Sequence, residues 1–218
     1  MDRHLSRLID DARRLGLPTV DEFTVRAGFS ELGRAAFGAS DGVIRLQHSR
    51  AADGRSSWLG IPRRLGDEPS GWMAIRAPVV HEGPRPWSGV KRSGALEYPL
   101  ARDAARQRGA DEALFADEAG RLIEGARSNL FLVLANGAWS TPDLQRGGVT
   151  GIARARVLEA TDRFSVCDVP FAALTTAREV VAVNAVRGAR PIVRLDGAPV
   201  GSPRGPALAM LEELLGLP

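Results

Sequence analysis

The sequence predicts a mixed α+β fold. Hydrophobic residues make up 44% of the 218 residues and charged residues 25%, which is the ordinary composition of a globular protein. Segments with helical spacing of apolar residues are interspersed with short alternating or apolar runs typical of strands. These segments do not follow a regular strand–helix–strand rhythm, and no internal repeat is present, which favours α+β over a parallel α/β sheet.

The N-terminal part is predicted to contain one helix and two strands. Apolar residues recur at helical spacing from Leu5 to Leu15, and Gly16 can end that helix. In residues 42–50 two sets of side chains alternate as on the two faces of a strand, and residues 71–78 form a short apolar run that predicts a second strand. Residues 79–90 are rich in Gly and Pro and predict a linker. We therefore expect a small domain over 1–85 and a larger one over 86–218.

The C-terminal part shows a longer series of elements. Its first three strands have predicted turns at Glu118 to Gly120, between the first two strands, and at Asn136-Gly137, at the end of the third. The predicted elements are a helix at 95–109, strands at 112–117, 121–125 and 129–137, a helix at 152–160, strands at 178–186 and 190–197, and a helix at 205–216.

Composition excludes several classes of protein. The net charge is only +3 without a block of basic residues, so we expect no nucleic-acid partner. A single cysteine, Cys167, excludes an internal disulfide, and the absence of a signal peptide or long apolar span predicts a cytoplasmic protein without a membrane segment. His4, His48 and His81 lie far apart, so no metal site is expected.

Lys91, in the stretch SGVKRSG, is the only lysine; the other 28 of the 29 basic Lys and Arg residues are arginine. An arginine side chain does not lose its proton, whereas a lysine amine can do so, attack a carbonyl and form a Schiff base. Lys91 is thus either present by chance in an arginine-rich chain or required for a reaction that needs a lysine amine.

Three further features have both an ordinary and a functional interpretation. Glu124 can be a solvated strand-end residue, Arg7 a surface arginine, and the glycine-rich turn 147–151 before a helix only a turn. Together with Lys91 they meet the needs of pyridoxal phosphate: an amine for its aldehyde, a carboxylate for its pyridine nitrogen, and backbone N–H groups with an arginine for its phosphate.

Between about residues 88 and 197 the chain resembles the class IV aminotransferase family. The matching stretches are GVK at 89–91, GADEALFAD at 109–117, IEGARSNLF at 123–131, the TP, L and GGVTGIAR of 141–154, and NAVRGARPI at 184–192. The resemblance implies a two-domain fold like that of D-amino-acid aminotransferase, and a homodimer. The family's opening strands would precede His4, so we expect a shortened N-terminal domain or a start further upstream.

The resemblance also implies the roles of individual residues. Lys91 would hold the cofactor as a Schiff base and act as the general base, and Glu124 would pair with the pyridine nitrogen. The phosphate would be bound by the turn, the start of the following helix and an arginine: Gly151, Ile152, Ala153 and Arg7. Arg50 and Arg187 are candidates to bind substrate carboxylates, although each can equally be a solvated arginine.

The residues that separate the branches of the family favour a lyase. Transaminases commonly carry Thr at the positions of Ala153 and Ala185, the latter touching the phosphate, and NAVRG is more similar to the lyase branch. The predicted reaction is that of 4-amino-4-deoxychorismate lyase, which releases pyruvate and gives 4-aminobenzoate for folate synthesis. The alternatives are a branched-chain or D-amino-acid transaminase and a catalytically impaired member of the family.

Overall fold

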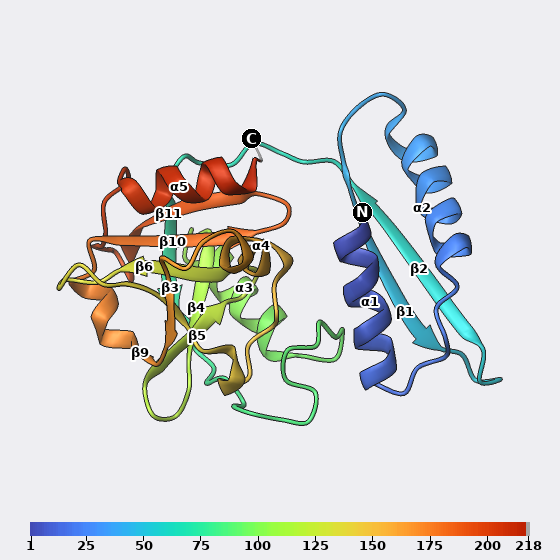
Figure 1. Ribbon diagram of the computed structural model, residues 1–218, viewed down its shortest axis with the longest axis horizontal. Coiled ribbons are helices and arrows are strands. Elements are labelled where there is room, and N and C mark those ends of the chain that lie inside the picture. Colours follow the sequence, from blue (N-terminus) through green and yellow to red (C-terminus); the bar gives the residue numbers. More distant parts are fainter. Residues whose placement is uncertain (217–218) are drawn as a thin grey trace. The chain divides into compact units, whose positions relative to one another are not determined.

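A computed structural model describes residues 1–216 of the chain, which divide into two compact units, Met1–Glu68 and the part from Pro69 onward (Figure 1). The division falls earlier than the predicted 85/86 boundary. Strand β3 (Trp72–Arg76) pairs with two strands of the C-terminal sheet and therefore belongs to that unit. The Gly- and Pro-rich stretch 79–90 thus lies within the C-terminal unit, between β3 and the next helix.

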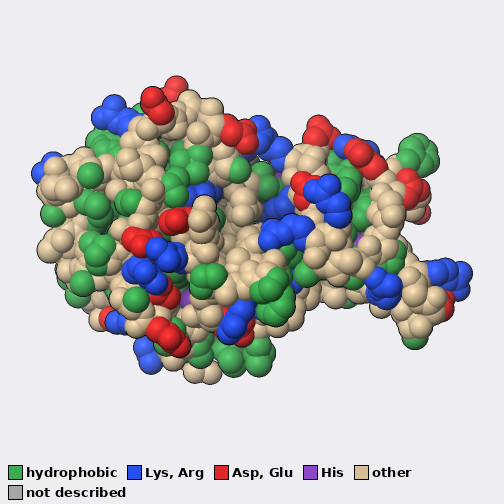
Figure 2. Space-filling model, turned by 60° about the horizontal axis from the view of Figure 1, so that its bottom comes forward, with side chains coloured by type: hydrophobic (Ala, Val, Ile, Leu, Met, Phe, Trp, Pro, Cys, Tyr) green, Lys and Arg blue, Asp and Glu red, His purple; other side chains and the backbone are tan. Residues whose placement is uncertain are grey.

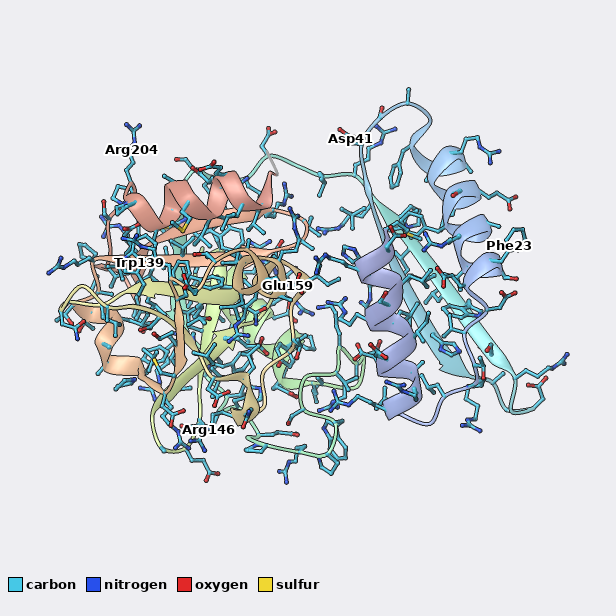
Figure 3. All side chains as sticks on the ribbon, in the orientation of Figure 1. Phe23, Asp41, Trp139, Arg146, Glu159 and Arg204 are labelled. Atoms are coloured by element: carbon cyan, nitrogen blue, oxygen red, sulfur yellow. The ribbon has the colours of Figure 1, made fainter. Side chains whose placement is uncertain are left out.

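The N-terminal unit consists of two helices and an antiparallel hairpin: α1 (Asp2–Arg14), α2 (Glu22–Phe37), β1 (Val43–Arg50) and β2 (Ser56–Arg63). The predicted first helix and first strand are confirmed. Helix α2 begins at Asp21, whose carboxylate accepts a hydrogen bond from the Phe23 N–H at 3.1 Å. The Phe23 side chain projects from α2 and is 80% exposed (Figure 3).

The C-terminal unit is built on a mixed ten-stranded sheet. Its order is β8-β7-β6-β10-β11-β3-β4-β5-β9, with β12 beside β11. The pairs β11–β3, β3–β4 and β7–β8 are parallel and the others antiparallel. Besides β3, the strands are β4 (Glu112–Ala116), β5 (Arg121–Gly125), β6 (Asn129–Val133), β7 (Trp139–Pro142), β8 (Ser165–Cys167), β9 (Val169–Pro170), β10 (Glu179–Asn184), β11 (Gly188–Leu195) and β12 (Ala198–Pro199).

Three α-helices and two 3₁₀ helices accompany this sheet: α3 (Glu97–Gln107), α4 (Ile152–Ala160), α5 (Pro206–Leu215), η1 (Leu144–Arg146) and η2 (Phe171–Thr175). The mixed α+β class is confirmed. All the predicted elements of this part are present, with ends that differ by at most four residues. The strands of this part that the sequence did not predict, β7, β8, β9 and β12, have only two to four residues each.

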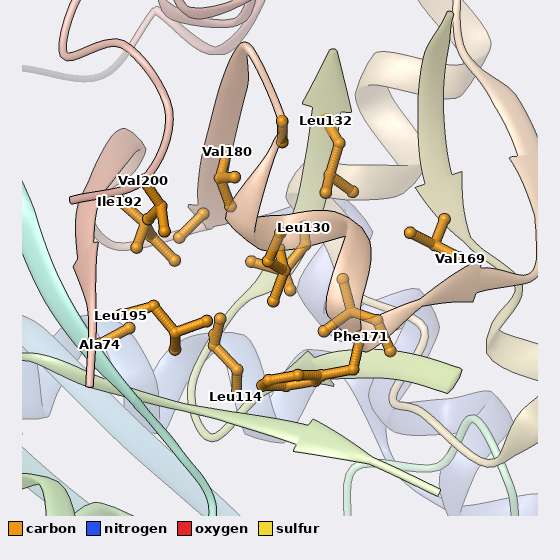
Figure 4. Packing of buried hydrophobic residues seen from close by; sticks show 14 of the residues in the cluster. Ala74, Leu114, Leu130, Leu132, Val169, Phe171, Val180, Ile192, Leu195 and Val200 are labelled. Atoms are coloured by element: carbon orange, nitrogen blue, oxygen red, sulfur yellow. The ribbon is translucent and has the colours of Figure 1, made fainter. Parts of the chain in front are cut away.

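The central strands β6 and β10 are buried on both faces of the sheet. Leu130 and Leu132 of β6 pack in one cluster with residues of β3, β4, β11 and η2, and Figure 4 shows this cluster. Phe131 and Val133 point to the opposite face and pack against α4 and α5. Since successive strand side chains alternate between faces, two buried faces require a continuous apolar run, which NLFLV provides.

Helix α5 begins at Gly205, and its first N–H groups are capped by a distant residue. The carboxylate of Glu179, on β10, accepts hydrogen bonds from the N–H groups of Ala207 at 3.2 Å and Leu208 at 2.9 Å.

Replacing Glu179 with Ala should lower the free energy of unfolding by about 1–2 kcal/mol, as loss of other helix caps does. Urea denaturation measures this change, and Glu179→Gln, which keeps one acceptor oxygen, should lose less. Equal stability of Glu179→Ala and the wild type would contradict the capping role.

The surface carries both signs of charge. On the face shown in Figure 2, Lys and Arg side chains are interspersed with Asp and Glu side chains. Within residues 1–216, no helix combines the length and the apolar character that crossing a bilayer requires. The same residues contain no group of three His, Cys, Asp or Glu side chains arranged to hold a metal ion.

Candidate active site

The carboxylate of Glu124 lies in the interior of the C-terminal unit. Glu124 is on β5 and is 2% exposed. Its Oε1 accepts hydrogen bonds from the Tyr98 hydroxyl at 2.5 Å and from the Val149 N–H at 2.9 Å, and its Oε2 accepts one from Asn129 Nδ2 at 2.9 Å. These three donors come from α3, from the turn before α4 and from the start of β6, so Glu124 joins segments far apart in the sequence.

Burial raises the pKa of Glu124 from its ordinary value of 4.5 to about 7. The hydrogen bonds from Tyr98 and Val149 and the positive charge of Lys91 act in the opposite direction and lower this pKa, while the charge of Glu112 raises it. A buried carboxyl of this kind is stabilised as an anion by a protonated base placed beside it. The pyridine nitrogen of pyridoxal phosphate is such a base.

Lys91 follows directly on a segment that is fixed to the glycine-rich turn. Gly89 forms a parallel β-bridge with Val149, and its carbonyl accepts a hydrogen bond from the Thr150 N–H at 3.0 Å. Val90 is buried, and Lys91 itself is exposed. Val149 also donates to Glu124, so the turn connects the lysine and the carboxylate that the resemblance assigns to one cofactor.

The turn before α4 has no space for side chains at its glycines, Gly147, Gly148 and Gly151. A Cβ on Gly148 would lie 2.6 Å from the Leu144 side chain and 3.3 Å from the Glu124 carboxyl carbon, and one on Gly151 would collide with the Asn129 amide oxygen. Gly151 is the N-cap of α4 and offers no side-chain cap, and the first turn of α4 has no acidic residue. The N–H groups of Ile152 and Ala153 are therefore suited to bind an anion.

The start of this turn is anchored by an ion pair. The Arg146 guanidinium, at the end of η1, donates to both carboxylate oxygens of Asp168, at 3.1 and 2.9 Å. Arg146 is labelled in Figure 3. Two parallel hydrogen bonds between an arginine and a carboxylate define the orientation of both groups, so this pair holds the chain where it enters the turn.

These groups fit pyridoxal phosphate. An amine, a buried carboxylate and a helix start suited to bind an anion come from connected segments of one unit: Lys91, Glu124, Gly151, Ile152 and Ala153. Because Gly148 and Gly151 carry no Cβ, the turn can lie close to the Glu124 carboxylate and the Asn129 side chain. The residues present therefore match the three chemical requirements of the cofactor.

Ala185 and Arg187 lie in the turn between β10 and β11. The Asn184 side-chain oxygen accepts hydrogen bonds from the Val186 N–H at 2.9 Å and the Arg187 N–H at 2.8 Å, which fixes this turn. Because Val183 is the strand partner of Asn129, the turn leaves the sheet at the end where Asn129 binds Glu124. The roles given to Ala185 and Arg187 stay predictions.

Arg7 and Arg50 belong to the N-terminal unit. The Arg7 Nε lies 4.0 Å from the Asp11 carboxylate on α1, and the Arg50 guanidinium donates to the carbonyl of Gly16. Each arginine thus has a partner in its own unit. Their roles toward the phosphate and the substrate stay predictions from the resemblance.

The sequence did not predict that Tyr98 and Asn129 contact Glu124. Tyr98 is the only tyrosine in the chain, and the argument from scarcity that singles out Lys91 applies to it as well. Asn129 is a polar residue at the start of a fully buried strand, where an unpaired amide would be costly. The scarcity of tyrosine and the polar residue at the start of a buried strand are both visible in the sequence, but neither identifies Glu124 as the group that is contacted.

The raised pKa of Glu124 predicts a pH dependence of the cofactor-free protein. A carboxyl with a raised pKa in the folded state stabilises the fold at low pH, and that contribution is lost as the pH rises from about 4.5 through about 7. Glu124→Gln removes the titrating group. Urea denaturation across this pH window should therefore show wild type losing stability relative to Glu124→Gln as the pH rises; parallel curves would contradict the raised pKa.

The model of the family Amino-transferase class IV matches residues 1–195. The crystal structure of 4-amino-4-deoxychorismate lyase from Pseudomonas aeruginosa is similar with a TM-score of 0.84 and 30% identity, over 98% of this chain and 83% of that chain. The branched-chain amino acid aminotransferase of Escherichia coli has the same fold, with a TM-score of 0.83 and 22% identity over 99% of this chain and 77% of that chain.

A protein of Methanocaldococcus jannaschii, named as a branched-chain-amino-acid aminotransferase, is 26% identical over 219 residues, which are 90% of this chain and 74% of the relative. The cofactor of class IV aminotransferases is pyridoxal phosphate, in agreement with the groups described above. With the family model matching most of its length, the chain belongs to the class IV aminotransferase family of pyridoxal-phosphate-dependent enzymes.

Proposed function

We propose that this enzyme is a 4-amino-4-deoxychorismate lyase, which cleaves its substrate to pyruvate and 4-aminobenzoate in folate synthesis. The observation that carries the proposal is the 30% identity with the Pseudomonas aeruginosa lyase over 98% of the chain. Ala153 and Ala185 support it, since neither offers the hydroxyl group that transaminases commonly have at these positions.

Bound pyridoxal phosphate supplies an electron sink for the carbon from which a proton is removed. The residues of the chain would do the rest. The N–H groups at the start of α4 would bind the phosphate, and the Glu124 carboxylate would keep the pyridine nitrogen protonated. Lys91 would hold the aldehyde carbon through Nζ and, once displaced by the amine of the substrate, would take up the proton.

The fate of that proton separates the two reactions. In a lyase, Lys91 removes the proton from the carbon that bears the amine, the bond to the pyruvyl group breaks, and the remaining ring becomes aromatic. Aromaticity supplies the driving force. In a transaminase, Lys91 would instead both take up and deliver the proton, and the product would be a keto acid.

The second candidate is a branched-chain amino acid transaminase, favoured by the names of the relatives from Methanocaldococcus jannaschii and Aquifex aeolicus. The latter is 31% identical over 130 residues, which are 56% of this chain and 42% of that relative. The test supplies the purified holoenzyme with aminodeoxychorismate, and separately with a branched-chain amino acid and 2-oxoglutarate. Formation of 4-aminobenzoate supports the lyase; glutamate alone overturns it, and no product in either assay indicates an impaired member.

The homodimer and the cytoplasmic location rest on the resemblance and on composition and stay predictions. Light scattering of the purified protein measures its oligomeric state. Fractionation of source cells measures its location in the cell.

A further inference from the structure

The hydroxyl of Tyr98 lies between the side chains of His81 and Glu124. The Tyr98 hydroxyl donates to Glu124 Oε1 at 2.5 Å, and His81 Nε2 lies 3.2 Å from the Tyr98 hydroxyl oxygen. The other ring nitrogen of His81, Nδ1, accepts a hydrogen bond from the Gly83 N–H at 3.2 Å. An imidazole nitrogen that accepts an N–H carries no proton, so the proton of neutral His81 is on Nε2. The hydrogen bonds therefore run in one direction, from His81 to Tyr98 to Glu124.

Aromatic packing and the glycine turn hold these rings in place. Phe115, which is fully buried, contacts the rings of His81 and Tyr98 edge-on, with centroids 5.7 and 5.2 Å away. His81 is 4% exposed. A Cβ on Gly147 would lie 2.7 Å from the His81 ring, so the turn before α4 also packs against this ring. The row of three side chains is thus packed between Phe115 and the turn before α4.

The protonation states agree with this direction. Burial lowers the pKa of His81 and raises that of Tyr98, so both side chains are neutral at physiological pH. The charged groups that act on the row are Glu97, Glu82, Asp117 and Arg92 around His81, Glu97 and Arg92 around Tyr98, and Lys91 and Glu112 around Glu124.

The two oxygens of Glu124 are not equivalent. Oε1 accepts from both Tyr98 and Val149, which is its full capacity, whereas Oε2 accepts one hydrogen bond within residues 1–216, from Asn129. We propose that Tyr98, oriented by His81, is a positioning residue that occupies Oε1 and leaves Oε2 to bind the pyridine nitrogen of the cofactor. The inference rests on pyridoxal phosphate as the cofactor and is independent of whether the reaction is a lyase or a transaminase reaction.

A hydrogen bond to a carboxylate stabilises its ionised form. Removing the Tyr98 hydroxyl makes Glu124 hold a proton more strongly, so Glu124 competes with the pyridine nitrogen for that proton. In Tyr98→Phe the nitrogen should lose its proton at a lower pH than in the wild type, by about one pH unit. A Tyr98 that only fills space would leave this midpoint unchanged.

The test loads wild-type and variant holoenzymes with pyridoxal phosphate labelled with ¹⁵N and follows the nitrogen chemical shift against pH, without substrate. Tyr98→Phe should lower the pH midpoint of the nitrogen. His81→Phe should lower this midpoint less, because Tyr98 then still donates to Glu124 but no longer accepts a hydrogen bond from His81. His81→Gln can donate to Tyr98 from a similar position and should restore the midpoint of the wild type. Phe115→Leu disturbs the packing without removing a hydrogen bond and is the matched control.

An unchanged midpoint in Tyr98→Phe, with bound cofactor and a cooperative melting curve, overturns the inference. An equal shift in Phe115→Leu also overturns it, since packing would then explain the effect. Should Tyr98→Phe not fold, the two His81 variants decide: equal midpoints in His81→Phe and His81→Gln would contradict the proposed orientation. Because no substrate is present, none of these outcomes depends on the lyase reaction.

Discussion

Lys91→Arg is expected to lower kcat/KM by about 1000-fold or more, since arginine cannot give up its proton to act as a base or bind an aldehyde carbon. The substitution keeps the positive charge that acts on Glu124 and so separates charge from amine chemistry. Borohydride reduction followed by measurement of the intact mass should show cofactor fixed to the wild-type chain and none fixed to the variant.

The neighbouring Arg92 provides a matched control. Arg92→Lys places a second amine one residue further along, in the same segment, and should remain active with cofactor fixed at Lys91. The exchange variant Lys91→Arg with Arg92→Lys has the composition and charge of the wild type, but its amine lies at the wrong residue. Activity in this exchange variant close to that of the wild type would contradict the assignment of Lys91.

The fold could be predicted wherever apolar residues form a clear pattern. The continuous runs of β6 and β10 are buried on both faces, and both strands were predicted. Helix α2 was not, since Gly28 and Gly33 weaken its helical propensity. Strand β2 contains Gly60 and Pro62, which the β-propensities disfavour. Both elements form through their packing within the N-terminal unit, which no local pattern reports.

The site could be predicted in part, for a similar reason. Lys91 and the turn at Gly151 are recognisable because a rare residue or a glycine is needed for a local chemical or steric reason. The hydrogen bond between Tyr98 and Glu124 joins residues 26 apart, and its formation depends on how α3 lies against β5. Sequence spacing carries no information on such a contact, so only the structure identifies Tyr98 as a partner.

Glu124→Gln is expected to lower kcat/KM by about 100-fold and to weaken cofactor binding. Truncating one partner of a buried charged pair costs about 3 kcal/mol, and each 1.4 kcal/mol corresponds to about a tenfold change in rate. The neutral amide can still accept hydrogen bonds from Tyr98 and Val149, but it cannot stabilise a protonated pyridine nitrogen. Steady-state kinetics and a fluorescence titration of the cofactor measure the two effects.

Glu112 offers the control for burial. It is 1% exposed, its pKa is raised by burial, and it accepts hydrogen bonds from the Ser128 hydroxyl at 2.6 Å and the Ala113 N–H at 3.0 Å. Glu112→Gln should therefore change stability while most of the activity remains. If both variants lost activity equally, the loss would follow from removing any buried carboxyl; only a loss confined to Glu124→Gln assigns the pyridine nitrogen to this carboxylate.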